Sequence, residues 1–269
     1  MGKVTGEHIK YKSDGAGISA YLARPDMQGS FPAVIVIHEI FGLDGHIEDV
    51  ARRFAASGYV ALAPDLYSRP GTPVTMQEIA ESMGFMMGIP PAKQRDPAVM
   101  VEEMAKLPEA KKAAVGKTMQ WLMHRDYSDN VLDLQSALKW LSEQEYVSKG
   151  AIASLGFCMG GTLSARLAAT GADLSACVIF YGESPPEEQI RNIRCPVLGL
   201  YGSEDHRITD AMPQFEKAMK ENGKRFDHRV YSGAYHAFFN DTRPHYSKDA
   251  AADAWKTVLS FLGESVPKS

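Results

Sequence analysis

Residues 156–161, which read GFCMGG, constrain the fold of this chain more than any other segment. A nucleophile with a glycine two residues before it and another two residues after it is typical of a sharp turn between a strand and a helix, which the glycines allow to approach closely. Gly156 and Gly160 hold those places, and Cys158 stands where a serine is more usual. The positive end of the following helix favours the thiolate form of such a cysteine. The segment therefore predicts a nucleophile elbow that carries a thiol.

The neighbouring residues supply the strand and the helix that this turn requires. Residues 150–155 (GAIASL) form a mostly apolar run of the length of a buried strand. Residues 162–169 (TLSARLAA) read as a helix with a face of small side chains. A buried structural cysteine beside a glycine turn is the alternative interpretation, and the flanking pattern favours the nucleophile.

Composition makes several classes of function improbable. Of the 269 residues, 45% are hydrophobic and 23% are charged, and the formal net charge of -4 provides no basic surface for nucleic acid. The three cysteines, Cys158, Cys177 and Cys195, form no C-x-x-C pair, so neither a disulfide framework nor a zinc cluster is predicted. We interpret Cys177 and Cys195, which lie in or beside apolar strand patterns, as core residues. No apolar run has the length of a signal peptide or a membrane span, so we expect a cytoplasmic protein without membrane contact.

Hydrophobic periodicity predicts strands that alternate with helices. Residues 4–12 and 17–24 flank an Asp-Gly turn and predict an antiparallel hairpin. Further strands are predicted at 33–37, 59–63, 150–156, 176–181, 197–201 and 226–231, and helices at 46–57, 129–144, 162–169, 210–222 and 248–262. This order predicts an α/β fold with a mostly parallel central sheet, helices on both faces and the hairpin at one edge.

Residues 70–125 interrupt this alternation. They combine PGTP at 70–73 and PP at 90–91 with helical stretches at 99–107 and 109–124. The segment is rich in methionine, with Met83, Met86, Met87, Met100, Met104, Met119 and Met123. A small helical core is the favoured interpretation of these side chains, and an adaptable wall of a substrate pocket is the alternative. We predict one domain over residues 1–269, with a helical cap-like insertion at about 70–125.

A thiol nucleophile needs a base to take its proton and an acid to orient the base. In folds with a nucleophile elbow, these residues follow one another along the chain in the order nucleophile, acid, histidine. Asp205 follows the strand at 197–201, at the carboxyl end where open α/β sheets place their ligands. A turn or capping aspartate is the alternative, and Glu204 is the neighbouring competitor. His236 follows the strand at 226–231 in a glycine-containing loop and suits a general base. His206 is the one further plausible base, while His8, His46, His124, His228 and His245 lie on predicted polar faces or irregular segments.

An oxyanion hole needs two backbone N–H groups, one from the residue after the nucleophile and one from the loop after an early strand. Met159 supplies the first, and Ile40, after the strand at 33–37, is the best candidate for the second. Glu39 would then project its carboxylate towards the thiol, where it could accept a hydrogen bond from the S–H group or exchange a proton. A surface carboxylate on a loop is the alternative.

Taken together, these motifs resemble the dienelactone hydrolases, also called carboxymethylenebutenolidases, a branch of the α/β-hydrolases. The resemblance extends over residues 8–262 except 70–125, and rests on HEIFG at 38–42, PDLY at 64–67, GFCMGG at 156–161, GSED at 202–205 and GAYHAF at 233–238. It implies the α/β-hydrolase fold and a triad of Cys158, His236 and Asp205, with Glu39 controlling the protonation of the thiol. It also implies Ile40 and Met159 as the oxyanion hole. The family opens an unsaturated lactone that carries a carboxylate, and it uses no metal or organic cofactor.

The chain departs from the family at the residues that hold the substrate carboxylate. Members specific for dienelactones have an arginine four residues after the histidine, and this chain has Asn240 there. An amide is a weaker partner for a carboxylate than a guanidinium, so the pocket could accept another lactone or ester. Arg243, further along the loop, is a possible replacement, and Phe238 is a further candidate substrate-binding residue. A second arginine of the family falls within the divergent insertion, where neither Arg69 nor Arg95 can be matched to it.

Three functions are compatible with these residues. The first is a hydrolase of small carboxylic esters or lactones that works through an acyl-thioester on Cys158. The second is a non-catalytic ligand-binding or sensing protein on the same fold. The third is a thiol that responds to oxidation. The intact set of Cys158, Asp205, His236 and Glu39 favours the hydrolase, with a small-molecule ester or lactone as its partner and either a monomer or a dimer as its assembly.

Overall fold

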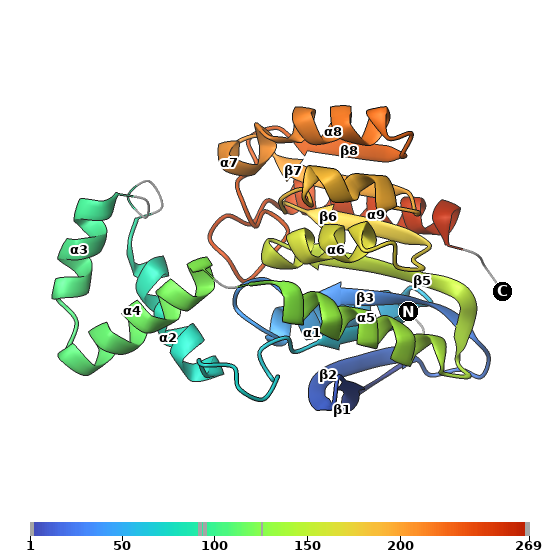
Figure 1. Ribbon diagram of the computed structural model, residues 1–269, viewed down its shortest axis with the longest axis horizontal. Coiled ribbons are helices and arrows are strands. Elements are labelled where there is room, and N and C mark those ends of the chain that lie inside the picture. Colours follow the sequence, from blue (N-terminus) through green and yellow to red (C-terminus); the bar gives the residue numbers. More distant parts are fainter. Residues whose placement is uncertain (1–2, 91–92, 94–95, 125, 267–269) are drawn as a thin grey trace.

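A single twisted sheet carries the candidate residues. The computed structural model describes residues 3–90, 93, 96–124 and 126–266. Its eight strands follow the order β1-β2-β4-β3-β5-β6-β7-β8 (Figure 1). β2 pairs with β1 and with β4 in antiparallel fashion, and every other neighbouring pair is parallel. The strands are β1 Val4–Ser13, β2 Ala16–Pro25, β3 Phe31–Ile37, β4 Val60–Pro64, β5 Val147–Phe157, β6 Ala176–Phe180, β7 Val197–Gly202 and β8 Phe226–Tyr231.

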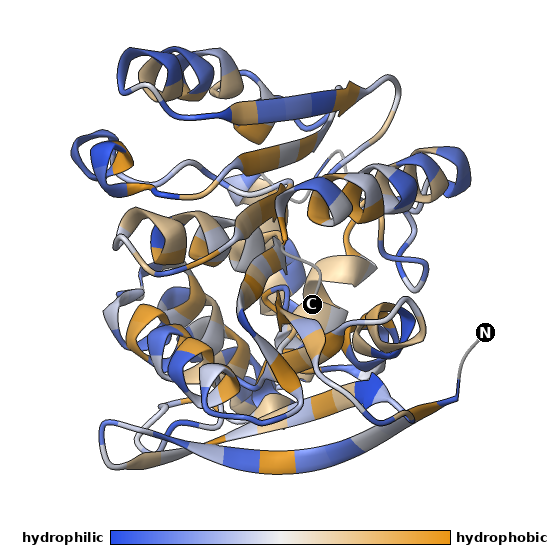
Figure 2. Cartoon of the chain, turned by 90° about the vertical axis from the view of Figure 1, so that its right-hand side faces the viewer, coloured by the Kyte–Doolittle hydropathy of each residue, from blue (hydrophilic) through white to orange (hydrophobic). Residues whose placement is uncertain are grey.

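Helices cover both faces of the sheet, as the alternating pattern predicted. One face packs on α1 and α9 through a hydrophobic cluster that includes Phe54 and Phe261. The other face packs on α5, α6 and α8 through a second cluster that includes Leu134, Leu163 and Phe215. Figure 2 shows the hydrophobic residues concentrated on the central strands. These helices are α1 Gly45–Ala56, α5 Ser128–Ser142, α6 Met159–Ala169, α7 His206–Thr209, α8 Met212–Glu221 and α9 Lys248–Ser265, with a 3₁₀ helix at Glu187–Asn192.

The N-terminal hairpin forms where the Asp-Gly pair predicted it. Asp14 and Gly15, the two residues between β1 and β2, both have positive φ, at 46° and 76°. This conformation matches the twist of the flanking strands, and aspartate and glycine are among the residues that adopt it most readily. The hairpin therefore closes one edge of the sheet and leaves the opposite, parallel strands to carry the site.

Three helices of the insertion extend away from the sheet (Figure 1). They are α2 Met76–Gly88, α3 Pro97–Ala105 and α4 Glu109–His124. The sequence analysis did not name α2, although Thr75 and Glu78 form the capping box that signals its start. Ile79 and Met83 of α2 join the hydrophobic cluster on the α5 and α6 face, whereas α3 buries none of its residues. None of the helices within the described ranges combines the length and apolar composition needed to cross a membrane.

Candidate active site

Cys158 lies at a strained turn between β5 and α6. Its φ of 55° and ψ of -116° lie outside the regions that non-glycine residues usually occupy. The turn requires glycine on both sides, because a Cβ at position 156 would lie 2.0 Å from the Gly160 carbonyl oxygen and one at position 160 would lie 2.2 Å from the Ile37 carbonyl oxygen. These contacts hold β5, α6 and the end of β3 together, and they place the thiol at the carboxyl edge of the sheet.

His236 and Asp205 lie together beside this thiol. The Nδ1 atom of His236, in the loop after β8, is 2.5 Å from the Oδ2 atom of Asp205, which is buried at the end of β7. Burial disfavours the charged imidazolium. Nevertheless, the nearby Cys158 sulfur, to which His236 is hydrogen-bonded, and the Asp205 carboxylate outweigh burial and raise the pKa of His236 to about 10. The three predicted side chains therefore form one connected group.

The competing acid and base lie elsewhere. The exposed carboxylate of Glu204 accepts a hydrogen bond from the neighbouring Ser203 hydroxyl at 2.9 Å. The His206 side chain is 73% exposed and faces Asp210 within one helical turn. Both point to surface partners, so the geometry favours Asp205 and His236 over their sequence neighbours.

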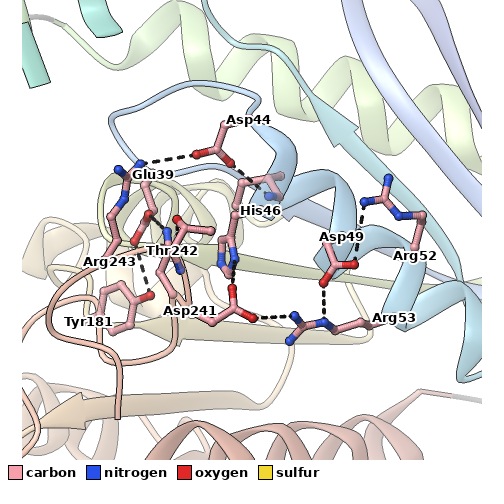
Figure 3. A network of polar contacts seen from close by, with 12 residues as sticks. Glu39, Asp44, His46, Asp49, Arg52, Arg53, Tyr181, Asp241, Thr242 and Arg243 are labelled. Atoms are coloured by element: carbon pink, nitrogen blue, oxygen red, sulfur yellow. Dashed lines mark hydrogen bonds and ion pairs between the residues drawn. The ribbon is translucent and has the colours of Figure 1, made fainter. Parts of the chain in front are cut away.

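Glu39 is buried beside the group, in contacts that the sequence did not predict. One of its carboxylate oxygens accepts a hydrogen bond from the Asn240 side-chain amide at 2.6 Å. The other accepts one from the Tyr181 hydroxyl at 3.4 Å (Figure 3). Burial raises the pKa of the Glu39 carboxyl, against the opposing effects of the Asn240 amide and of nearby cationic side chains. The expected hydrogen bond between Glu39 and the thiol is thus replaced, among the described residues, by bonds to Asn240 and Tyr181.

The loop after β3 presents the predicted oxyanion-hole residues. The backbone N–H groups of Ile40 and Met159 have no hydrogen-bond acceptor among the described residues. The Tyr67 hydroxyl donates to the Ile40 carbonyl oxygen at 3.0 Å and lies 3.6 Å from the Met159 sulfur, so one side chain contacts both. The Leu66 N–H donates to His38 Nε2, which leaves His38 Nδ1 to donate to the Glu39 carbonyl oxygen at 2.6 Å. Tyr67 and His38 therefore hold this loop in place. Both residues belong to the sequence motifs at 38–42 and 64–67, but the sequence did not predict these contacts.

Comparisons with known proteins agree on one family. The model of the "Dienelactone hydrolase family" matches residues 18–266. A "Putative carboxymethylenebutenolidase" of Saccharolobus solfataricus is 42% identical over 257 residues, which is 95% of this chain and 97% of the relative. One from Methylorubrum extorquens is 31% identical, with 97% of this chain and 81% of the relative covered.

The chain belongs to the dienelactone hydrolase family.

Solved structures agree with this assignment. A "Putative Dienelactone Hydrolase" from Klebsiella pneumoniae superimposes with a TM-score of 0.71 at 28% identity, covering 97% of this chain and 99% of its own. A dienelactone hydrolase-like promiscuous phosphotriesterase from metagenomic libraries reaches 0.74 at 23% identity, with 99% and 100% covered, and supports the fold alone. The chain is accordingly a carboxylic ester or lactone hydrolase with the α/β-hydrolase fold.

Two of the three candidate substrate-binding residues of this dienelactone hydrolase family member face inwards. The Phe238 side chain is fully buried between Tyr181, Phe180 and Tyr231, so the expectation that it contacts substrate is wrong: the strand and loop around it form a continuous aromatic core. Asn240 is also fully buried, and its amide is occupied on both sides by Glu39 and Thr242.

Arg243 is the one of the three candidates whose side chain is partly exposed. Its guanidinium stacks 3.6 Å from the centre of the Phe41 ring and lies 3.5 Å from the Asp44 carboxylate. One terminal nitrogen also lies 3.4 Å from the sulfur of Met87 in α2, and Nε has no hydrogen-bond partner among the described residues. Arg69, by contrast, is fully engaged with the buried Asp133 and with Ser13. Arg95 lies outside the described residues.

His46 is not the surface residue that the sequence analysis expected. Its side chain is 1% exposed, because the first turn of α1 packs against the Phe157 and Phe239 rings. Nδ1 lies 3.3 Å from an Asp241 carboxylate oxygen, and Nε2 has no partner among the described residues. The apolar spacing of α1 could have revealed this, since His46 precedes the buried Ile47 and lies four residues before the buried Val50. Within the part of the chain that the structure describes, no group of three or more His, Cys, Asp or Glu side chains could hold a metal ion.

Proposed function

We propose that Cys158, His236 and Asp205 act as a catalytic triad that hydrolyses small carboxylic esters or lactones through an acyl-thioester. The observation that carries the proposal is the connected arrangement of the three side chains at a nucleophile elbow. The raised pKa of His236 favours its protonated form, which can keep the proton taken from Cys158 and stabilise negative charge on the sulfur.

The proposed reaction has two halves. The Cys158 thiolate attacks the carbonyl carbon and forms a C–S bond, while the Ile40 and Met159 N–H groups stabilise the negative oxygen. The C–O bond then breaks, and the departing oxygen takes the proton of His236. In the second half, His236 takes a proton from water as the water oxygen attacks the thioester carbonyl carbon. The C–S bond then breaks, the product acid leaves, and Cys158 and the protonated His236 are restored. Asp205 keeps His236 in the tautomer that both steps need.

A thiol of this kind suits substrates whose leaving group is stabilised, such as enol and aryl esters, and suits stable amides poorly. Arg243 is the side chain that could recognise an anionic part of the substrate, because its guanidinium is partly exposed and only one terminal nitrogen faces Asp44, at 3.5 Å. The contact of Arg243 with Met87 places α2 of the insertion beside the same region. We propose that the insertion and Arg243 together decide which ester or lactone enters, while the triad performs the chemistry.

Replacement of the nucleophile tests this function. Cys158→Ala should lower kcat for an activated aryl ester by at least about 10³-fold, because the residual rate comes from binding and the oxyanion hole alone. Circular dichroism and the melting temperature should stay close to those of the wild type. A folded Cys158→Ala variant with a nearly normal rate would remove the triad from the account. Ligand binding without turnover in the wild type would instead support a binding protein.

Glu39 is proposed to control the protonation of the thiol through its own titration. Since burial raises the Glu39 pKa, its carboxyl takes up its charge at a higher pH than an exposed glutamate does. The rate at which iodoacetamide alkylates Cys158 should then show a pH-dependent step that Glu39→Gln abolishes. Glutamine keeps an acceptor for Asn240, so the fold should persist. An alkylation profile that Glu39→Gln does not change would exclude Glu39 from the mechanism.

A further inference from the structure

Glu39 owes its orientation to a loop that follows β8, and that loop is fastened to α1. The Asn240 side-chain oxygen accepts hydrogen bonds from the Thr242 N–H at 3.0 Å and from the Thr242 hydroxyl at 2.7 Å. This fixes which end of the amide faces Glu39, so the NH₂ group must be the one that donates to the carboxylate. Asn240 is therefore set in place by residues 241–243 rather than by its own packing alone.

Three contacts tie residues 241–243 to the N-cap, the first turn and the last turn of α1, as Figure 3 shows. Asp241 lies between the buried His46 and Arg53, with an oxygen 3.3 Å from His46 Nδ1 and the other 3.0 Å from Arg53 Nη2. Arg243 lies 3.5 Å from Asp44, the N-cap of α1, which also accepts a hydrogen bond from the Ile47 N–H. We call Asp44, His46 and Arg53 the α1 clamp.

The chemistry of the α1 clamp suits a rigid hold. Arg53 is itself fixed by Asp49 at 2.6 Å, one turn earlier in the helix. Although burial opposes the charge, Arg53 and His46 together lower the pKa of the Asp241 carboxyl, which therefore stays ionised at neutral pH. His46 is enclosed by aromatic rings, and in the described part of the chain its one hydrogen-bond partner is the Asp241 carboxylate, at Nδ1. The loop is held by charge-assisted bonds on both sides of Thr242.

We propose that Asp241 is a positioning residue, which the α1 clamp grips so that the Asn240 amide holds the Glu39 carboxylate at the site. This inference rests on the proposed role of Glu39. The titratable or charged groups that act on Glu39 are His46, His236, Arg243 and Tyr181, and Cys158 interacts in turn with His236 and Tyr181. Freeing Asn240 removes the closest neutral donor that favours the charged carboxylate, so Glu39 should titrate at higher pH.

The test uses the full chain with Asp241→Ala and a matched control, Asp253→Ala. Asp253 likewise accepts from an arginine, Arg229, and from a second side chain, Tyr231, at similar exposure, but it does not contact residues 240–243. In Asp241→Ala, the NMR signal of the Asn240 side-chain amide, assigned by its loss in Asn240→Ala, should broaden or move. The Glu39-dependent step in the alkylation profile of Cys158 should shift to higher pH, and kcat should fall about threefold to tenfold. Asp253→Ala should leave all three unchanged.

The double variant Asn240→Ala/Asp241→Ala should alkylate as Asn240→Ala does, because both changes act through one amide. Additive shifts would overturn the proposal, and so would an Asn240 amide signal in Asp241→Ala that matches the wild type. If the amide signal changes while the profile stays fixed, Asp241 is only structural. If Glu39→Gln also leaves the pH profile of Cys158 alkylation unchanged, the proposed role of Glu39 has failed. The Asn240 amide signal in Asp241→Ala then still shows whether the α1 clamp positions Asn240. Arg53→Gln, which removes the charged partner of Asp241 at a partly exposed position, replaces Asp241→Ala if that variant does not fold.

Discussion

The carboxyl edge of the sheet and the helical insertion are built in opposite ways. At the sheet edge, polar side chains such as Glu39, Asp205 and Asn240 are at most 4% exposed, and each has a defined partner. In the insertion, α3 buries no residue, and the ion pairs of Lys106 with Glu102 and Glu103 lie at the surface. Exposed ion pairs contribute little to stability. The difference indicates that the chemistry depends on a fixed framework, whereas the insertion tolerates variation.

The largest effect on activity is expected at the sheet edge. Asp205→Asn should lower kcat by about 10³–10⁴-fold, because an amide no longer favours the His236 tautomer and charge that the proposed triad needs. The neighbouring exposed carboxylate supplies the control, and Glu204→Gln should stay within about twofold of the wild type. Steady-state kinetics on one activated ester measures both. Equal losses in the two variants would contradict the assignment of the acid.

The next effect concerns stability at the elbow. Gly156→Ala should lower the free energy of unfolding by at least about 3 kcal/mol, or prevent folding, because the new Cβ would lie 2.0 Å from the Gly160 carbonyl oxygen. Backbone, unlike a flexible side chain, cannot move aside there. Denaturant unfolding measures the change, and a loss below about 1 kcal/mol would mean that the strand and helix are less tightly joined than the structure indicates.

The smallest effect is expected in the insertion, with the opposite sign. A Cβ added to Gly84, within α2, would meet no atom within 4 Å, and the φ of this residue is not positive. Gly84→Ala should therefore raise the stability of the helix by about 0.5–1 kcal/mol. Proteolysis of the insertion and thermal unfolding should both report it. If Gly84→Ala instead destabilises the protein as Gly156→Ala does, the contrast between the two regions is lost.

The sequence predicted the strands and helices whose apolar residues follow a regular period. Apolar runs and amphipathic stretches located the six strands that follow the hairpin and the long helices of the body, because burial in a parallel sheet leaves that signature. The Asp-Gly turn located the two hairpin strands. The nucleophile elbow was recognisable from its glycines, since only glycine fits the close backbone contacts at positions 156 and 160. The Asp205 and His236 candidates followed from the position of each strand end, and the structure brings both together with Cys158.

The contacts around Glu39 could not be read in the same way. Asn240 and Glu39 are 201 residues apart, and Asp241 and His46 are 195 apart, so no local pattern links them. The departure at position 240 suggested a weaker carboxylate binder, whereas the amide is turned inwards and serves Glu39. Phe238 misled for a similar reason, because an aromatic residue beside a catalytic loop can pack inwards as readily as outwards.

Trapping the acyl-enzyme tests the central claim most directly. The protein is mixed with an excess of an activated aryl ester, quenched in acid within the first turnover, digested, and analysed by mass spectrometry. The account predicts that the peptide containing Cys158 gains the mass of the acyl group, that hydroxylamine removes it, and that the Cys177 and Cys195 peptides stay unmodified. An active enzyme that accumulates the acyl group on another residue, or that shows a burst of product with an unmodified Cys158, would contradict it.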